Sequence, residues 1–222
     1  MSLPPDPRVA YTAGDPVETE HRALKHALVG ECRRVIDRIA LLDPERTGVP
    51  ELAQLVDETR ALGDRLDGMP SLRRFGGLAT SGADDAALME RSGVSGRSNP
   101  LAPPLHLEMT GGVTRGHAVY TTAYEGPPGC LHGGFVAAAF DDMMGFAQMA
   151  SGFAGYTGTL TVKMRRPTPL DRRIDFESGL DRVDGRKILC WGKSWDGDTL
   201  LCEATILFIA PREGLMPGQA AR

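Results

Sequence analysis

The spacing of apolar residues predicts that the first part of the chain is helical. Apolar residues recur at helical intervals over about residues 16–42 and again over about residues 50–66. Asp15-Pro16-Val17-Glu18 resembles a capping box with proline at the first helical position, which places the start of the first helix near Pro16. Together the two segments predict an αα-hairpin with a single apolar face. The residues of that face are Leu24, Leu28, Val35, Ile39, Leu42, Leu52, Leu55, Val56, Leu62 and Leu66.

The pattern changes at Leu105, where apolar and polar residues begin to alternate among β-forming residue types. A segment rich in apolar and small residues over about residues 133–151 interrupts this alternation and predicts one helix. Few of its positions are polar, so we expect the helix to be covered on most sides by a curved sheet. Asp184-Gly185 and Asp196-Gly197-Asp198 are hairpin turn signals. The predicted strands lie at about residues 105–109, 113–124, 157–166, 172–183, 187–195 and 199–210.

Residues 68–104 are rich in Gly, Ser, Asp and Pro and separate the helical pattern from the segment of alternating apolar and polar residues. We therefore expect three parts: a helical extension with its linker over residues 1–99, an α+β domain over residues 100–212, and a flexible tail over residues 213–222. The fold class expected for the domain is one long central helix wrapped by an antiparallel sheet.

Composition excludes several classes of partner. The 222 residues carry a net charge of −4, with a pI near 5.8, and 41% of them are hydrophobic. This charge gives no general attraction to nucleic acid or to an anionic membrane. The segment 18–67 has about eleven acidic and eight basic residues, so it contains no basic recognition helix. The N-terminal residues lack a signal-peptide pattern and no apolar run could span a bilayer, so we expect a cytoplasmic protein without membrane insertion.

The start of the predicted central helix is the first candidate for chemistry. Gly133 and Gly134 open the helix, where backbone N–H groups have no intrahelical acceptor. Because glycine lacks a Cβ atom, another molecule can approach this backbone closely. The partial positive charge at a helix start favours negative charge on a substrate oxygen. These residues therefore predict a site for a carbonyl oxygen.

Asp141 is the second candidate. It follows Gly134 by seven residues, nearly two helical turns, so both lie on almost the same face together with Ala138 and Gly145. A face of small residues with one carboxylate suits a slot better than a packed core. The separation between Gly134 and Asp141 is roughly 10 Å along the axis, too far for both to touch one carbonyl carbon. Two antiparallel copies of the helix would solve this, since Asp141 of one chain could approach the glycines of the other.

These residues resemble a known family. His132-Gly133-Gly134 followed by Asp141 is similar to the phenylacetate-pathway (PaaI-type) branch of hot-dog-fold acyl-CoA thioesterases and to mammalian thioesterase superfamily members near it. The resemblance extends to EGPPG before the histidine, MRRPTPL at 164–170, RVDGRK at 182–187 and CEATILFIA at 202–210. It covers about residues 100–211. The first hundred residues match no family that we can name.

The resemblance implies hydrolysis of an acyl-CoA to the free acid and CoA by a homodimer, or a dimer of dimers, in fatty acid metabolism, with no separate cofactor and no metal. Asp141 would be the general base or the nucleophile. The amide of Gly134 would polarise the thioester carbonyl from the partner chain, His132 would hold the loop, and Thr157 would position Asp141 or the attacking water. Implied substrate contacts are Gly133, Cys130, Leu131, Ala138, Arg165 and Arg166.

Each candidate also has an ordinary structural interpretation. His132 could merely satisfy loop backbone groups, and Thr157 could be a plain strand residue. Asp142 shares a face with apolar residues and needs a partner there, and it would be the working acid if the register shifted by one residue. Cys130 has no orienting group for nucleophilic chemistry. The basic cluster Lys163, Arg165, Arg166, Arg172 and Arg173 could bind CoA phosphates or simply face water.

Two other functions remain open from the sequence. One is a non-catalytic acyl-CoA-binding regulator whose helical extension contacts a partner, and the other is a hydratase acting on enoyl-CoA, whose Asp and His loop pairing we do not find. The extension could pack its apolar stripe on the sheet or on a partner subunit, or it could form a lid over an acyl tunnel. Acyl-chain length cannot be predicted.

Overall fold

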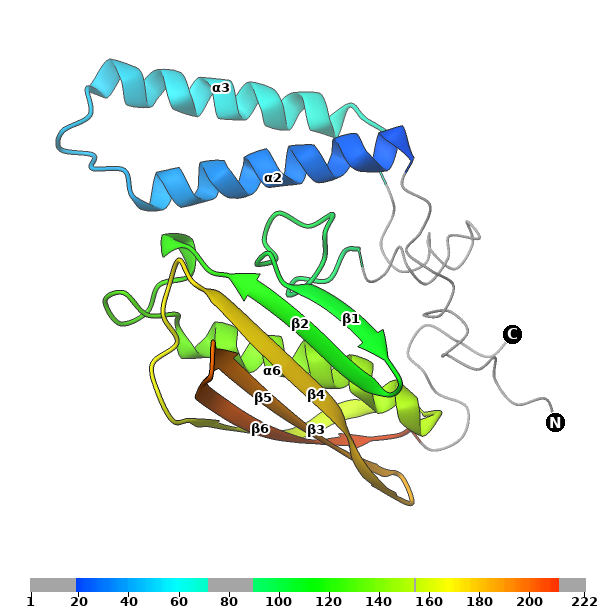
Figure 1. The fold of residues 1–222 in the computed structure, drawn as a ribbon. Helices are drawn as coiled ribbons and strands as arrows, with labels where there is room; N and C mark the ends of the chain where they lie inside the picture. The colour runs from blue at the N-terminus through cyan, green and yellow to red at the C-terminus, as the bar shows by residue number, and fades with distance from the viewer. Residues whose placement is uncertain (1–18, 72–89, 154, 212–222) are drawn as a thin grey trace.

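An antiparallel sheet wraps around one central helix in the computed structural model, which describes residues 19–71, 90–153 and 155–211. The helix is α6 (Gly133–Ala147), and Figure 1 shows it lying in the curve of the sheet. The strands follow the order β1-β2-β4-β5-β6-β3, and every neighbouring pair is antiparallel. Their bounds are β1 His106–Thr110, β2 Val113–Val119, β3 Tyr156–Met164, β4 Arg173–Asp184, β5 Lys187–Asp196 and β6 Thr199–Ile209.

The core lies between α6 and the inner faces of the strands. Phe140 on α6 meets Phe176 on β4 edge to face, with ring centroids 5.8 Å apart. Gly192 on β5 makes room for this ring, because a Cβ atom there would lie 2.7 Å from Phe140 Cδ1. The alternation predicted from sequence is visible in β5 and β6, where every second residue over most of each strand is buried. The main buried side chains around this centre are Ile174, Ile188, Cys190, Ala204, Ile206 and Phe208.

Two predicted elements end differently from the expectation. The strand predicted to reach Tyr124 stops at Val119, and residues Thr122–Tyr124 form the 3-10 turn η1. The turn buries the ring of Tyr124, which packs edge to face against Tyr120 with ring centroids 5.8 Å apart. The predicted central helix is α-helical only to Ala147, and its last turn is the 3-10 helix η2 (Gln148–Ser151), which ends at Gly152 with φ 77°.

The extension is an αα-hairpin, as predicted. Helices α2 (Glu20–Ala40) and α3 (Val49–Asp67) run side by side and antiparallel (Figure 1). Thr19 caps α2 by accepting a hydrogen bond of 3.2 Å from the amide of Arg22. The predicted cap at Asp15 lies outside the described residues, and the helix begins at Glu20 rather than near Pro16. The predicted domain boundary at residue 99 stays a prediction.

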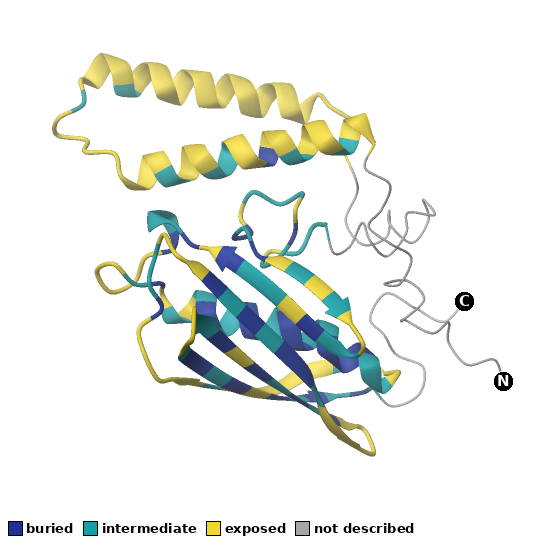
Figure 2. Cartoon of the chain, viewed as in Figure 1, coloured by how far each residue is buried: buried dark blue, intermediate teal, exposed yellow. Residues whose placement is uncertain are grey.

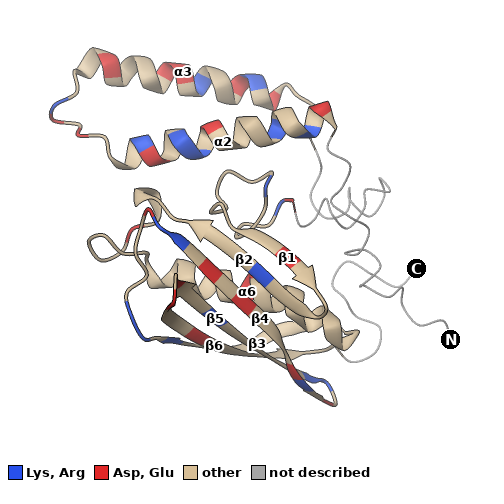
Figure 3. Cartoon of the chain, viewed as in Figure 1, with Lys and Arg blue, Asp and Glu red and all other residues tan. Residues whose placement is uncertain are grey.

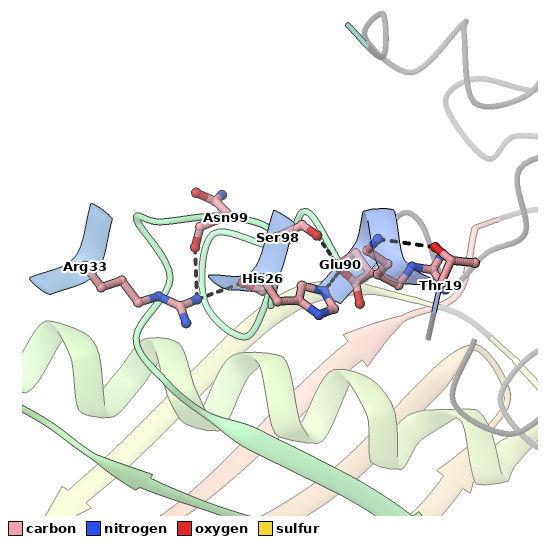
Figure 4. A network of polar contacts seen from close by, with 8 residues as sticks. Thr19, His26, Arg33, Glu90, Ser98 and Asn99 are labelled. Atoms are coloured by element: carbon pink, nitrogen blue, oxygen red, sulfur yellow. Dashed lines mark hydrogen bonds and ion pairs between the residues drawn. The ribbon is translucent and has the colours of Figure 1, made fainter. Parts of the chain in front are cut away.

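A polar stripe of α2 attaches the hairpin to the rest of the chain (Figure 4). His26 Nε2 lies 2.7 Å from Glu90 Oε2, and the Arg33 guanidinium donates to the carbonyls of Gly96 and Asn99, both at 3.0 Å. Asp37 accepts a hydrogen bond of 3.2 Å from the amide of Ala123. The expectation that the apolar stripe packs on the sheet therefore does not hold in this chain: the side facing the body is the polar one.

Strand β3 lies at the edge of the sheet, at the opposite end of the strand order from β1. Its side chains are exposed at seven of nine positions. The whole arrangement, a central helix wrapped by an antiparallel sheet with an N-terminal helical extension, confirms the fold class predicted from the sequence.

Candidate active site

The loop before α6 fixes the position of the helix start. Glu125 Oε1 accepts a hydrogen bond of 2.6 Å from the amide of Gly129, which has φ 73° and so favours glycine. The amide of Leu131 donates to Thr168 O at 2.8 Å, and that of His132 donates to Tyr124 O at 2.9 Å. Because consecutive amides are tied to two separate segments, His132 is held at the N-cap position of α6.

The His132 ring caps the helix. Its Nδ1 accepts a hydrogen bond of 3.0 Å from the amide of Gly134. An imidazole nitrogen can accept only when it carries no proton, so the ring proton of neutral His132 resides on Nε2, and that N–H is on an exposed residue. The Gly134 amide, expected to be open to a substrate oxygen, is therefore occupied in this conformation. Gly133 precedes it as the first helical residue, whose amide has no intrahelical acceptor.

Asp141 and Thr157 meet directly. Thr157 Oγ1 donates a hydrogen bond of 2.8 Å to Asp141 Oδ1. The strand register shifts between Thr157 and Thr159, so one extra residue interrupts the pairing of β3 with β6. Because of this bulge, Thr157 pairs with Phe208, whose buried side chain faces the core, and points to the same side of the sheet. The bulge thus aims Thr157 at the central helix.

The Asp141–Thr157 pair and the start of α6 lie at opposite ends of the line along which α6 and β3 adjoin, which we call the α6–β3 border. Thr157 at the start of β3 meets Asp141, while Met164 at its end lies beside Gly133, where an added Cβ atom would be 3.0 Å from Met164 Cε. The stripe of α6 between them consists of small residues and is not covered by the chain's own sheet: Gly134 is exposed, and Ala138, Asp141 and Gly145 are partly exposed. A single chain therefore holds two half-sites roughly 10 Å apart along the helix axis.

Asp142 points elsewhere and has its own partners. Ser95 and Ser92, in the segment 90–99, hydrogen-bond to its carboxylate. The Oδ2 atom of that carboxylate is itself buried without a hydrogen-bond partner. Burial, with a smaller contribution from the charge of Asp141, raises the pKa of Asp142 above its usual value, and the serine hydrogen bonds oppose the rise. The geometry therefore separates the two neighbouring acids: Asp141 reaches Thr157, and Asp142 binds the loop. Sequence reasoning missed Ser92 and Ser95, because nothing in SGVSG marks them as partners of a helix fifty residues away.

The basic residues after β3 divide into paired and unpaired side chains. Arg165 forms an ion pair with Glu203, Arg172 with Asp196 at 2.8 Å, and Arg173 with Asp175 at 2.9 Å. Arg166 makes no ion pair within the described residues. Arg165 and Arg166 line a hollow of about 670 Å³ together with Asp198, Thr199 and Leu200. This hollow follows Met164 along the chain and so lies towards the helix-start end of the border.

The remaining sequence-predicted residues lie around the helix start. Cys130 is half-buried as a free thiol and forms an isolated bridge with Pro169, while Leu131 is buried in the core. Among residues 19–71, 90–153 and 155–211, no group of three His, Cys, Asp or Glu side chains is arranged to hold a metal ion. In the same residues no helix combines the length and apolar character needed to cross a membrane.

Comparison with known proteins points to one superfamily. No protein-family model matches the chain. Over 87 residues, 38% of the chain, it is 40% identical to acyl-coenzyme A thioesterase THEM4 of Bos taurus and 37% identical to that of Xenopus laevis. The matched part spans only 35% and 39% of those two proteins, so it corresponds to little more than a third of each relative's length.

One solved structure resembles nearly the whole chain. A crystal structure of a thioesterase superfamily protein superposes with a TM-score of 0.72 and 29% sequence identity, covering 88% of this chain and 97% of that one. The likeness therefore extends well beyond the segment shared with the curated relatives. With the wrapped helix and the HGG motif at its start, these similarities show that the chain has the hot-dog fold and resembles a thioesterase superfamily protein over most of its length.

Proposed function

We propose that this protein hydrolyses an acyl-CoA thioester to the free acid and CoA, with Asp141 as the acting carboxylate. The observation that carries the proposal is the 2.8 Å hydrogen bond from Thr157 to Asp141 Oδ1, which orients a carboxylate on a stripe of small residues. The names of the Bos taurus and Xenopus laevis relatives support the same reaction.

Asp141 would act on the thioester carbon in one of two ways. With Oδ1 held by Thr157, Oδ2 would either take a proton from a water that attacks the carbon, or attack the carbon itself to form an acyl anhydride that water then cleaves. In both routes the carbon–sulfur bond breaks, and CoA leaves as a thiol after taking up a proton. Label from water in the Asp141 carboxylate after a single turnover would establish the anhydride route, since it enters there only when water attacks the Asp141 carbonyl of the anhydride.

The active unit would be a dimer built at the β3 edge. The distance of roughly 10 Å between Gly134 and Asp141 along α6 keeps one chain from supplying both groups to a single carbonyl. A two-fold axis beside β3 would pair the edge strands and set two α6 helices antiparallel, with their small-residue stripes in contact. Exposed Tyr156 and Met164, at 48% and 53%, would be covered there. Each site would then use Asp141 and Thr157 of one chain and the helix start of the other.

The helix start would stabilise the thioester oxygen. The amide of Gly133 points out of the first turn, and the amide of Gly134 becomes available when the substrate oxygen replaces His132 Nδ1 as its acceptor. His132 would then contact the substrate through its Nε2 proton. In this proposal the ring keeps the second amide satisfied until the substrate arrives.

The CoA moiety would extend from the helix start towards Arg166. Arg166 has no carboxylate partner within the described residues and lines the hollow beyond Met164, so it suits a phosphate better than the paired Arg165 does. Cys130 and Ala138, both partly exposed, would contribute contacts near the thioester, whereas the side chain of Leu131 is buried in the core.

The test is CoA release from a panel of short, medium, long and aromatic acyl-CoAs. We expect Asp141→Asn to lower kcat by about 10²–10⁴-fold, and Asp142→Asn, one residue along the same helix, to retain most of the rate. Absence of turnover across the panel would overturn the proposal. If acyl-CoA binds without turnover, the non-catalytic regulator replaces it.

A further inference from the structure

The α2–α3 hairpin exposes an unusual amount of apolar surface. Of nineteen large hydrophobic residues exposed among the described residues, twelve lie between positions 24 and 66. No residue of α3 is buried, and Val29 is the one buried residue of α2, as Figure 2 shows. Soluble proteins rarely leave so large an apolar patch in water unless another molecule covers it. The twelve are Leu24, Leu28, Val35, Ile36, Ile39, Leu41, Leu42, Val49, Leu55, Val56, Leu62 and Leu66.

The described part of the domain, residues 90–153 and 155–211, does not cover this surface. The side of α2 that faces the body carries His26 and Arg33, which bond to the segment 90–99 (Figure 4), and Asp37, which bonds to η1. At about 100° per residue, Val35 lies about 180° around the helix from His26. The apolar stripe of α2 therefore points away from the sheet, towards α3 and the solvent beyond it.

The spacing of the apolar residues is that of helices in a bundle. On α2, Leu28, Cys32, Val35 and Ile39 are separated by intervals of four, three and four residues, and Leu42, two residues beyond the helix end, follows after three more. On α3, Leu52, Leu55, Thr59, Leu62 and Leu66 follow intervals of three, four, three and four. Such alternating intervals form the seam of coiled coils and four-helix bundles. Two helices alone leave each seam half open, which matches side chains such as Leu28 and Leu66, each 42% exposed.

Charge favours a second hairpin as the cover. Helix α2 has five Lys or Arg against three Asp or Glu, and α3 has two against five, a difference visible in Figure 3. A two-fold axis parallel to the helices would lay α2 of one chain antiparallel on α3 of the other. That arrangement brings Lys25 of α2 towards Asp64 of the partner's α3, and Arg38 towards Glu51. An anionic membrane, by contrast, would be repelled by the acidic α3.

We propose that the hairpins of two chains associate through these faces into an antiparallel four-helix bundle. Two helices about 30 Å long and about 10 Å wide cover a flat area of about 600 Å². Protruding side chains make the accessible area of this face larger than its flat area, and close to the roughly 800 Å² per partner that stable interfaces bury. The hairpin contacts η1 and the 90–99 loop, at the end of the sheet away from β3. If the β3-edge dimer of the proposed function forms, each dimer carries two hairpins, and pairing of both hairpins with those of a second dimer closes a tetramer.

The first test is the mass of the full chain by light scattering. We expect four chains of 23.8 kDa for the wild type and two for the double variant Val35→Glu/Leu55→Glu. The matched control is Val119→Glu/Val183→Glu, which alters two residues of similar exposure outside the hairpin and should leave the tetramer intact. An unchanged mass in the hairpin variant overturns the proposal. A wild-type dimer that becomes a monomer in the hairpin variant keeps the bundle and counts against the β3-edge dimer instead.

The second test uses charge and does not depend on the apolar residues. Chains with Lys25→Glu/Arg38→Glu, or with Glu51→Lys/Asp64→Lys, should each lose hairpin association, since like charges then face each other across the bundle. An equimolar mixture should recover the wild-type mass, because each acidic α2 now meets a basic α3 of the other chain. Failure of the mixture to associate overturns the two-fold arrangement. CoA release is assayed in the same samples, so loss of the assembly and loss of hydrolysis are read separately.

Discussion

Thr157 on the edge strand β3 donates a hydrogen bond to Asp141 on the central helix across 2.8 Å, and the bulge between Thr157 and Thr159 gives the hydroxyl that direction. In an unbroken strand, Val162 and every second residue counted from it would face the helix. Thr157, five residues from Val162, would then face outward. One extra residue in the strand thus decides which side chain reaches the carboxylate.

Replacing the hydroxyl should therefore weaken catalysis more than substrate binding. For Thr157→Val we expect kcat for acyl-CoA hydrolysis to fall about 10–100-fold, as loss of a hydrogen bond to a charged group predicts, with a small change in KM. Thr157→Ser keeps the hydroxyl and should recover most of the rate. Steady-state kinetics of the three proteins check this, and a serine variant as slow as the valine variant would contradict it.

Subunit mixing should reveal the shared active site. Asp141→Asn removes the carboxylate, and Gly134→Pro removes an amide donor in the first helical turn, where proline is tolerated. Each variant alone should be nearly inactive. After subunit exchange at equal concentrations, half the dimers are mixed and each has one intact site, so about a quarter of wild-type activity should return. No recovery after verified exchange would place both groups in a site formed by one chain.

Asp142 should make stability depend on pH. Since burial raises the pKa of this carboxyl in the folded state, the fold binds its proton more tightly than the unfolded chain does. Its contribution is fully present below the usual pKa of an aspartate and is lost as pH rises through the raised value. Urea unfolding of the wild type and Asp142→Asn across that range measures it, and the variant should lose less stability on going to neutral pH.

The serine partners of Asp142 provide the complementary change. Ser95→Ala removes a hydrogen bond to a buried carboxylate and should lower the free energy of unfolding by about 1–3 kcal/mol at neutral pH. In the Asp142→Asn background the same substitution should cost less. Equal costs in both backgrounds would show that Ser95 acts independently of Asp142.

The attachment of the hairpin should weaken in acid. Burial alone would raise the pKa of Glu90, but hydrogen bonds from Ser98 and His26, with the charges of His26 and Arg97, hold it below its usual value. The stabilisation is present above the usual pKa of a glutamate and is lost as pH falls through the lowered value. Glu90→Gln should mimic acid at neutral pH, and hydrogen exchange of residues 20–40 should become faster. Unchanged exchange in the variant would show that Arg33 and Asp37 hold the helix without this pair.

Arg166 should affect substrate affinity alone. Arg166→Ala should raise KM for acyl-CoA about tenfold and leave kcat unchanged. A tenfold loss of affinity is what the removal of one partly exposed, charge-assisted phosphate contact predicts. Arg172→Ala, whose side chain is paired with Asp196, is the control and should have little effect on KM. Added salt should reduce the difference between wild type and Arg166→Ala.

The sequence by itself determined which residues share a face and where the chain turns. Period-two alternation placed β5 and β6, Asp184-Gly185 and Asp196-Gly197 marked their turns, and the small-residue segment after His132 identified the central helix. The helical rise alone separated Gly134 from Asp141. These features depend on neighbours in the chain, and local geometry fixes them.

Only the tertiary structure decided what each face meets. Periodicity grouped Leu28 with Val35, but it could not show that α2 turns its polar side to the body. Nor could it show that Ser92 and Ser95 bind Asp142, that His132 occupies the amide of Gly134, or that a bulge turns Thr157 towards Asp141. Each of these contacts joins segments whose distance in space depends on how the sheet and loops pack, and a one-residue shift in register changes the partner.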